Sequence, residues 1–199
     1  MKKKVKQDYL TIGIQGGKGS FNEEAINYYV KRNNLKKVKI RYLYTTDKVL
    51  QSLYKGEIDW GQFALWNSKG GLVRESLLAM AKYKFKILEE YAIKISHYLM
   101  VRKDVDLSQV SKIMTHPQVF AQCRETLSLR YPFLKQIVGQ GKLIDQAVIA
   151  KYLASGKISK NIAVMGSKVL AQIYKLKIVA ENLQDLKENY TTFLLVSRR

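Results

Sequence analysis

The chain has 199 residues, of which 47% are hydrophobic, and its formal net charge is +19. This length and hydrophobic content allow one domain or two small lobes with a buried core, and they exclude a disordered chain. A single cysteine, Cys123, excludes an internal disulfide and fits a reducing compartment. No apolar run reaches the roughly 18 residues of a membrane span or resembles a secretory signal, so we expect a cytoplasmic protein without membrane contact.

The positive charge says little about a partner. Lysines are spread along the whole chain, and residues 2–6 hold its one dense basic run. No zinc-finger, helix-turn-helix or RNA-binding sheet motif is present, so we do not expect nucleic acid to bind. The simpler interpretation is a lysine-rich surface exposed to solvent, with a small anionic ligand as the alternative.

Short apolar runs alternate with longer amphipathic ones, which predicts an α/β protein. In the first half, Ser20 is placed to cap a helix whose first turn carries Glu23 and Glu24. We expect strands at residues 9–14, 38–44 and 60–65, helices at residues 20–32, 46–55 and 72–83, and a loop at residues 67–71.

The second half repeats this alternation after an extended segment at residues 85–101. We expect strands at residues 112–114, 136–138, 162–165, 177–180 and 190–196, and helices at residues 117–131, 145–154 and 167–174. Two such α/β lobes predict a cleft, because ligands of open sheets bind outside the carboxyl ends of strands. We assign residues 1–95 with 190–199 to the first lobe and residues 96–189 to the second.

Two glycine-containing junctions between a strand and a helix suit ligand binding. The Gly-Gly-Lys-Gly turn of residues 16–19 lets a ligand approach the backbone, and free N–H groups at the helix start favour an anion. Its spacing matches neither a dinucleotide fingerprint nor a P-loop. The segment of residues 66–71 combines asparagine and serine with two glycines. Either segment is equally consistent with an ordinary turn.

Two further motifs carry polar groups. At residues 115–118, Thr115 is placed to cap a helix that begins with Pro117, and His116 is a candidate acid, base or hydrogen-bond donor. Cys123 follows in the same helix and is expected to pack in the core. Residues 191–193, Thr-Thr-Phe, begin the last strand, where successive side chains alternate between faces. Threonine is also simply a good strand former.

The order and spacing of these motifs resemble the prephenate dehydratase family over residues 10–197. Residues 16–21 resemble the family's Gly-Pro-x-Gly-Thr-Phe opening, and residues 59–73 its Asp-Tyr-Gly, Glu-Asn-Ser and Gly-Ser-Val block. Residues 115–123 resemble Ser-His-Pro-Gln followed by Ala-Gln-Cys, and residues 191–193 resemble the final Thr-Arg-Phe.

The resemblance implies a fold and an activity. The fold would be two α/β lobes with an interlobe cleft, similar to periplasmic ligand-binding proteins. The activity would be the decarboxylative dehydration of prephenate, a dicarboxylate, to phenylpyruvate in phenylalanine biosynthesis, with no cofactor and no metal. The resemblance also implies a homodimer or homotetramer. Family members often carry a C-terminal regulatory domain, which we do not expect here because the chain ends soon after the last strand.

The resemblance also assigns the site. Thr191 is the candidate catalytic donor to the leaving hydroxyl group. The expected substrate-binding residues are Gly19, Ser20, Asn67, Ser68, Thr115, His116, Gln118, Gln146, Thr192 and Phe193.

Three motif positions depart from the family pattern. The glutamate of Glu-Asn-Ser is Trp66, the arginine of Thr-Arg-Phe is Thr192, and a Ser-Thr pair maps to Asp145 and Gln146. If the lost acid and base formed an ion pair, their joint loss leaves no buried charge unmatched. We expect Trp66 to narrow the site or to offer it an aromatic face.

Two lysines are candidate replacements for the lost arginine. Lys18 and Lys69 fall in loops that the resemblance places at the cleft, and we expect them to act as point charges toward a carboxylate. Two alternatives stay open beside a working dehydratase. One is a divergent member that decarboxylates prephenate without forming an aromatic ring, and the other is a non-catalytic protein that binds a small anion.

Overall fold

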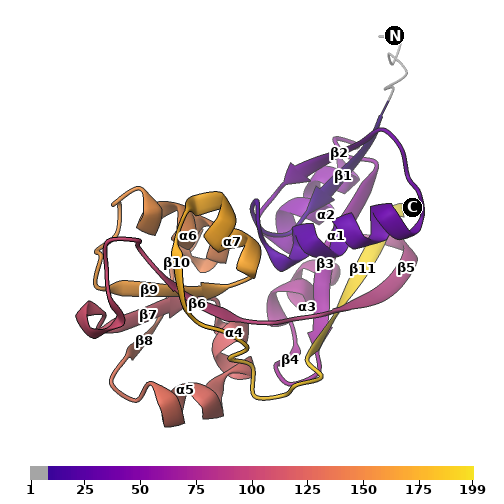
Figure 1. The fold of residues 1–199 in the computed structure, drawn as a ribbon. Coiled ribbons are helices and arrows are strands. Elements are labelled where there is room, and N and C mark those ends of the chain that lie inside the picture. The colour runs from indigo at the N-terminus through magenta and orange to yellow at the C-terminus, as the bar shows by residue number, and fades with distance from the viewer. Residues whose placement is uncertain (1–8) are drawn as a thin grey trace.

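Two β-sheets with helices packed against them organise the chain in the computed structural model, which describes residues 9–199 (Figure 1). The basic run of residues 2–6 lies outside the described residues. The sequence prediction of an α/β protein is therefore confirmed, and Figure 1 shows the two sheets in separate halves of the molecule.

The first sheet has the strand order β2-β1-β3-β11-β5, and β4 pairs with β3. β1 is parallel to both β2 and β3, whereas β11 is antiparallel to β3 and β5. Its core forms around the large buried side chains Phe63 and Phe193. The elements of this half are β1 (Leu10–Ile14), α1 (Phe21–Arg32), β2 (Val38–Tyr42), α2 (Thr46–Tyr54), β3 (Trp60–Asn67), β4 (Gly71–Leu72), α3 (Arg74–Met80), β5 (Phe85–Lys94) and β11 (Tyr190–Arg198).

The second sheet has the strand order β10-β6-β9-β7-β8. β7 is parallel to β8 and β9, and β6 is antiparallel to β9 and β10. All five residues of β9 are buried, as expected for a central strand covered on both faces. The elements are β6 (Tyr98–Val101), η1 (Leu107–Gln109), β7 (Lys112–Thr115), α4 (Pro117–Gln122), α5 (Arg124–Arg130), β8 (Lys135–Val138), η2 (Gly141–Ile144), α6 (Gln146–Ala154), β9 (Ile162–Gly166), α7 (Lys168–Tyr174) and β10 (Lys177–Ala180).

The chain passes between the halves twice, from β5 to β6 and from β10 to β11 (Figure 1). The extended segment predicted at residues 85–101 is thus two strands, one in each sheet, separated by residues 95–97. β11 returns to the first sheet and lies between β3 and β5. This return places the last strand, with Thr191, next to the end of β3.

Several predicted boundaries were wrong for local reasons. The helix predicted at residues 72–83 begins only at Arg74, because Gly71 and Leu72 pair with β3. The helix predicted at residues 117–131 is interrupted at Cys123, whose backbone (φ −123°, ψ 15°) is not helical. Thr115 does not cap α4; its hydroxyl donates to the Met165 carbonyl oxygen at 2.9 Å.

Other local predictions are confirmed. The Ser20 hydroxyl accepts a hydrogen bond from the Glu23 N–H at the start of α1, as an N-cap does. Pro117 occupies the first turn of α4. Cys123 is fully buried, and burial raises the pKa of its thiol, which fits packing rather than nucleophilic chemistry.

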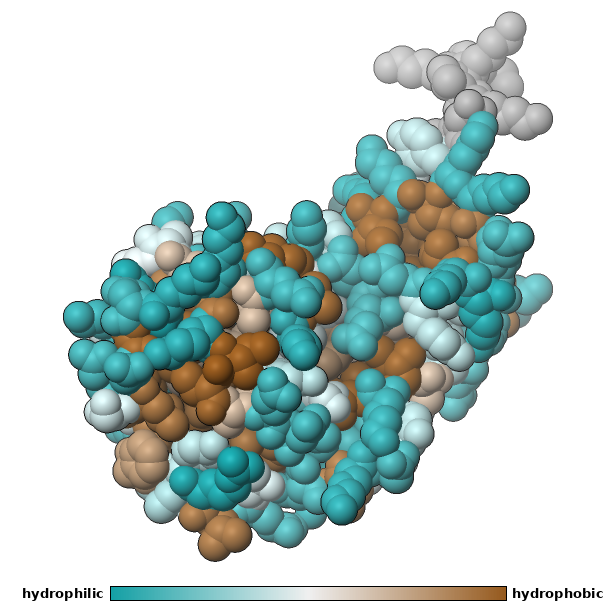
Figure 2. Space-filling view, viewed as in Figure 1, coloured by the Kyte–Doolittle hydropathy of each residue, from teal (hydrophilic) through white to brown (hydrophobic). Residues whose placement is uncertain are grey.

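Hydrophilic side chains are spread over the face of both halves drawn in Figure 2, with smaller apolar areas between them. Within residues 9–199, no helix is long and apolar enough to cross a lipid bilayer.

Candidate active site

A cavity of about 100 Å³ lies between the two sheets and is lined by residues of both halves. Among the residues that the sequence singled out, those that line it are Ser20, Asn67, His116, Gln118, Asp145, Gln146, Thr191 and Phe193. These residues come from segments far apart in the sequence. They meet because β11 returns to the first sheet and because α4 and α6 begin at the cavity. The predicted cleft residues therefore converge in large part on one place.

Thr191 and Asn67 form the centre of the wall contributed by the first sheet. They are direct partners in the ladder between β11 and β3. The Asn67 side-chain N–H donates to the Thr191 hydroxyl oxygen at 2.9 Å. Because that oxygen is used as an acceptor, the Thr191 hydroxyl hydrogen is free to point elsewhere. Thr191 is 8% exposed and lines the cavity, so its O–H is a hydrogen-bond donor available to a ligand.

The position of Asn67 is fixed by several hydrogen bonds. Its amide nitrogen also approaches the Asn189 side-chain oxygen and the Tyr190 carbonyl, each at 2.9 Å. Its amide oxygen accepts from the backbone N–H groups of Lys69 at 3.0 Å and Gly70 at 2.7 Å. A side chain that is 1% exposed and held on both sides cannot rotate away, so Asn67 orients the Thr191 hydroxyl.

A buried chain of hydrogen bonds continues from Asn67 to His97. Asn189 donates to the Gln122 side-chain oxygen at 2.9 Å, and the same oxygen lies 2.7 Å from His97 Nε2. Since this oxygen is an acceptor, the network assigns the imidazole proton to Nε2. Burial lowers the pKa of His97 to about 4, so the ring is neutral near pH 7. Its Nδ1 is then a buried acceptor, and it has no partner among the described residues.

His116 and Gln118 line the opposite wall at the start of α4. His116 Nδ1 accepts from the Gln118 backbone N–H at 3.1 Å, which assigns the proton to Nε2. Burial lowers the pKa of His116 to about 4. It is therefore a neutral hydrogen-bond donor near pH 7, not a proton donor. The Gln118 amide nitrogen donates to the Leu72 carbonyl at 2.9 Å, and its oxygen is a second buried acceptor without a partner in residues 9–199.

Two partly buried carboxyl groups also line the cavity. Asp145 caps α6 by accepting from the Val148 N–H at 3.0 Å, and it accepts from the Gly17 N–H at 3.1 Å. Glu75 accepts from the Thr46 N–H at 2.7 Å. Burial raises the pKa of both carboxyl groups. The Gly17 loop, expected to approach a ligand anion, thus lies against a carboxylate of the protein itself, and this contact joins the two halves.

Gly17 shows how close that contact is. A Cβ atom at this position would lie 3.1 Å from the Asp145 Oδ1, the Ala147 Cβ and the Tyr44 Cε1 atoms. Such distances are tighter than ordinary van der Waals contact, so a side chain here would push the two halves apart. The glycine that sequence reasoning connected with a ligand is required by the packing of the loop against α6.

The remaining predicted binding residues do not line the cavity; they are Gly19, Ser68, Thr115 and Thr192. The Ser68 hydroxyl accepts from the Tyr190 N–H at 2.9 Å and so fastens the loop after β3 to β11. The Gly19 N–H donates to the Glu23 carboxylate at 2.6 Å. These contacts are structural, and a direct role in binding stays a prediction for these residues.

The two lysines proposed as replacements for the family arginine do not reach the cavity. Lys69 pairs with Glu125 at 2.6 Å, and Lys18 is exposed. Neither lines the cavity, whose walls contain no lysine or arginine from residues 9–199. The expectation of a point charge at these positions is wrong, because Lys69 pairs with an acid of the other half and Lys18 is exposed outside the cavity.

Trp66 and Thr192, the other departures from the family pattern, lie directly opposite each other in the β3–β11 ladder. Trp66 is 41% exposed, and neither residue lines the cavity. The expectation that Trp66 narrows the site is therefore wrong. An acid and a base at these two positions would be cross-strand neighbours, which supports the interpretation that they were lost as a pair.

Sequence reasoning missed several lining residues, notably Gln15, Tyr44, Glu75, His97 and Gln122. His97 and Gln122 fall within the family-like segments but carry no local signal of a role. Glu75 sits within a predicted helix, and its contact with the start of α2 is visible only in three dimensions. Among the described residues, no group of three or more histidine, cysteine, aspartate or glutamate side chains is placed to hold a metal ion.

Fold and cavity together define an α/β protein with a candidate site between two sheets, lined by both polar and apolar residues. A sequence model of the family described as prephenate dehydratase matches residues 12–199. The chain therefore belongs to the prephenate dehydratase family.

Individual relatives agree with this assignment. The chain is 29% identical over 192 residues to a bifunctional chorismate mutase/prephenate dehydratase of Buchnera aphidicola subsp. Schizaphis graminum, covering 96% of this chain and 48% of that protein. It is 25% identical over 189 residues to arogenate dehydratase 2 of Petunia hybrida, covering 95% of this chain and 45% of that protein. The chain thus spans about half the length of the curated relatives it matches.

A solved structure is also similar. The prephenate dehydratase of Arthrobacter aurescens, determined in complex with L-Phe, superposes with a TM-score of 0.80 at 26% identity. The superposition covers 96% of this chain and 61% of that one. The arrangement of the two sheets is therefore shared over nearly the whole chain.

Proposed function

We propose that this chain catalyses the decarboxylative dehydration of prephenate to phenylpyruvate. Three observations support the proposal: the family assignment, the convergence of the family-like motifs on one cavity, and the oriented Thr191 hydroxyl within it. The last of these carries the chemical argument, because it supplies a hydrogen-bond donor at a fixed, buried position in the wall of the cavity.

The reaction sets clear demands. The bond from the ring carbon to the hydroxyl group breaks, the ring carboxylate leaves as CO2, and its bonding electrons complete the aromatic ring. Hydroxide is a poor leaving group, so a donor must stabilise the oxygen as negative charge develops on it. The Thr191 O–H, oriented by Asn67, meets this demand. The neutral His116 N–H offers a second donor from the opposite wall.

The cavity is small for a ligand the size of prephenate. Its volume of about 100 Å³ lies below the roughly 300–1,000 Å³ of common ligand pockets. We propose that the two sheets with their helices form two lobes, residues 9–95 with 190–199 and residues 96–189, and that these separate to admit substrate. Separation breaks the Gly17–Asp145 hydrogen bond across the cavity. A cytoplasmic location and a homodimer or homotetramer remain part of the proposal, resting on the family resemblance.

Incubation of the purified chain with prephenate near pH 7.5 tests the activity. We expect phenylpyruvate, followed by its absorbance in alkali, to form well above the spontaneous rate. Soluble, folded protein that leaves the rate at the spontaneous level would contradict the proposal. Prephenate consumed without phenylpyruvate would instead support a decarboxylase that does not aromatise the ring.

A second candidate substrate is arogenate, which carries an amino group where prephenate carries a keto oxygen. The cavity favours a ligand rich in hydrogen-bond donors. His97 Nδ1 and the side-chain oxygens of Gln118 and Gln146 are buried acceptors without partners in the described chain. Asp145 and Glu75 add two carboxyl groups, and the cavity walls contain no lysine or arginine from residues 9–199. An ammonium group supplies three donors and a positive charge to such a site.

A direct comparison of the two substrates separates these candidates. We expect kcat/KM for arogenate, measured as phenylalanine formed, to exceed that for prephenate if the acceptors contact the amino group. The matched variant is Asp145→Asn, which removes one charge and keeps the side-chain shape. An unchanged ratio of the two kcat/KM values in this variant, together with a preference for prephenate in the unaltered chain, would exclude the arogenate candidate.

A further inference from the structure

A second hollow lies beside the candidate active-site cavity. Its volume is about 590 Å³, within the roughly 300–1,000 Å³ of small-molecule sites. It shares Tyr44, Ile144 and Asp145 with the first cavity, so these three side chains form the wall between the two. The proposed lyase chemistry makes no use of the other residues that line it.

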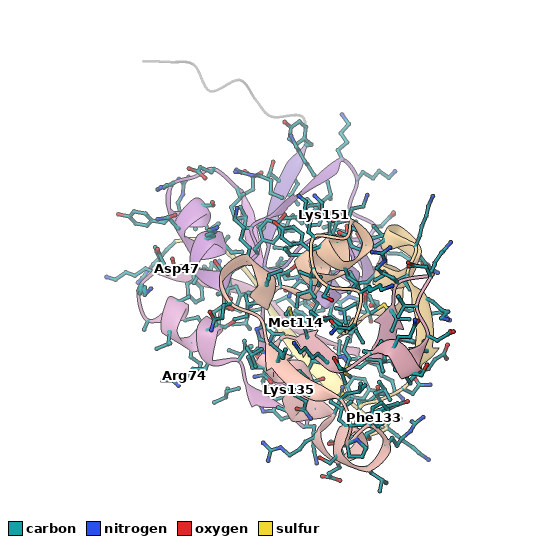
Figure 3. The ribbon with its side chains drawn as sticks, turned by 90° about the vertical axis from the view of Figure 1, so that its left-hand side faces the viewer. Asp47, Arg74, Met114, Phe133, Lys135 and Lys151 are labelled. Carbon is teal, nitrogen blue, oxygen red and sulfur yellow. The ribbon has the colours of Figure 1, made fainter. Side chains whose placement is uncertain are left out.

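Three lysines from both halves of the molecule line this second hollow. Lys48 lies on α2, Lys142 in η2 and Lys151 on α6. Figure 3 looks onto this side of the molecule and labels Lys151 on its helix and Asp47, the neighbour of Lys48, on α2. Within residues 9–199, these three lysines take part in none of the ion pairs, whose basic partners lie elsewhere.

The acidic residue in the lining of this hollow is Asp145. It does not pair with the lysines, because its two oxygens already accept hydrogen bonds from the Val148 and Gly17 N–H groups. Three positively charged side chains that line one hollow give it a positive potential, which favours an anion bound inside it. A ligand with several negative charges gains most from this potential.

Tyr44 provides a second, independent observation at the shared wall. Its φ of 66° lies in the left-handed region, which bulky residues rarely adopt. Strain of this kind persists where the surrounding structure holds a residue in place, often at a ligand site. The ring packs against Gly17 and lines both hollows. Tyr44 and Tyr152 also bring phenol groups to the lining, and phenols donate hydrogen bonds to anions.

We propose that the hollow lined by Lys48, Lys142 and Lys151 binds a small anion with two or more negative charges, of the phosphate or polycarboxylate class. Such an anion contacts α2 in one half and the η2–α6 segment in the other, so it holds the halves together beside the first cavity. Its binding is thereby coupled to the opening of that cavity. The site is distinct from the proposed substrate site, because it lies on the far side of the Tyr44–Asp145 wall.

Calorimetric titration of the purified chain with inorganic pyrophosphate, and separately with citrate, tests the proposal at about 0.15 M salt, where diffuse surface charge is screened. We expect saturable binding of one anion per chain. The triple variant Lys48→Gln/Lys142→Gln/Lys151→Gln should weaken binding about tenfold or more, since each lost charge pair contributes a modest part. Because no turnover is measured, the outcome is independent of the proposed lyase activity.

The control is a triple variant with the same charge change, Lys36→Gln/Lys86→Gln/Lys160→Gln. These lysines are exposed, as are the three lysines of the hollow, but they line neither hollow. Unchanged affinity in the control supports the site. Absence of saturable binding by both anions, or equal weakening in both triple variants, would overturn it. If the first triple variant does not fold, Lys142→Gln alone serves, since its exposed side chain lies in a short 3-10 helix.

Discussion

The two faces of the β3–β11 ladder differ in an instructive way. On one face, Asn67 and Thr191 form a cross-strand pair, line the cavity and keep the residue types of the family motifs. The next pair along the same strands, Trp66 and Thr192, lies outside the cavity and carries two of the three departures. Successive residues of a strand point to opposite faces of the sheet. Adjacent residues of one sequence motif therefore lie in two environments, one at the cavity and one away from it.

This difference changes how the departures should be interpreted. A glutamate replaced by tryptophan and an arginine replaced by threonine suggest a damaged site when read along the sequence. In the structure they alter a partly exposed cross-strand pair, while the oriented hydroxyl remains in place. The third departure is different, because Asp145 does line the cavity and adds a partly buried carboxyl group. We therefore expect altered substrate preference to arise from Asp145.

We expect the largest loss of stability when the cross-strand pair of Asn67 and Thr191 is broken by a change at Asn67. The change Asn67→Ala removes the acceptor of two backbone N–H groups and the donor to Thr191. Unpaired buried groups cost about 1–3 kcal/mol each, so we expect the free energy of unfolding to fall by about 3 kcal/mol or more. Urea unfolding followed by circular dichroism measures it. The neighbouring change Ser68→Ala, at a more exposed hydroxyl, is the control and should cost about 1 kcal/mol.

The buried histidine behind that pair predicts a dependence of stability on pH. The pKa of His97 is about 4 in the folded state, below its usual value of 6.5. The neutral ring therefore adds to the free energy of unfolding in full above pH 6.5. This contribution is lost as the pH falls toward 4, by up to about 3 kcal/mol. The raised pKa values of Asp145 and Glu75 act in the opposite sense, because their contribution is lost as the pH rises.

Unfolding measured between pH 4 and pH 7 for the unaltered chain and for His97→Gln isolates the contribution of the histidine. We expect the pH dependence over this interval to become shallower in the variant. Equal slopes in the two proteins would show that His97 does not carry the acid sensitivity.

A smaller effect is expected from the departure that does enter the cavity. In Asp145→Asn the partly buried carboxyl group becomes a neutral amide, whereas a capping oxygen toward Val148 remains. We expect the ratio of kcat/KM for arogenate to that for prephenate to fall about tenfold, which corresponds to about 1.4 kcal/mol. Initial rates with each substrate provide the ratio, and Asp47→Asn, at an acid that does not line the first cavity, is the matched control.

The smallest effect should come from restoring the outward-facing pair. A double change of Trp66→Glu with Thr192→Arg recreates the family acid and base as cross-strand neighbours. The coupling energy between them, from a double-mutant cycle, should be about 1 kcal/mol or less, and phenylpyruvate formation should change little. A large rise in activity would show instead that these two positions act on the substrate.

Local signals predicted most of the elements but not their partners. Alternating apolar runs indicated the strands, and Ser20 and Pro117 marked helix starts that the structure confirms. The pairing of Gly71 and Leu72 with β3 was missed because a two-residue strand has no periodicity of its own. His116 rather than Thr115 caps α4, since the Thr115 hydroxyl is occupied by the Met165 carbonyl from a distant strand.

The candidate site divides in the same way. Residues within recognisable motifs, such as Thr191 and His116, are placed at the cavity by the sequence alone. No lysine or arginine of residues 9–199 lines the cavity, and the sequence does not predict this. Lys69, for example, is held away from the cavity by Glu125, which comes from the other half of the molecule. Likewise, the buried acceptor on His97 follows from a hydrogen bond to Gln122 across 25 positions of sequence.

The most direct test of the central claim compares two adjacent threonines on opposite faces of β11. We would measure phenylpyruvate formation from prephenate by Thr191→Val and Thr192→Val, with arogenate in parallel. Loss of one positioned donor costs about 10²–10³-fold in kcat, so we predict a decrease of that size for Thr191→Val. Thr192→Val should stay close to the unaltered chain. Equal activity of the two variants, or greater loss in Thr192→Val, would contradict the assignment of Thr191 as the acting hydroxyl.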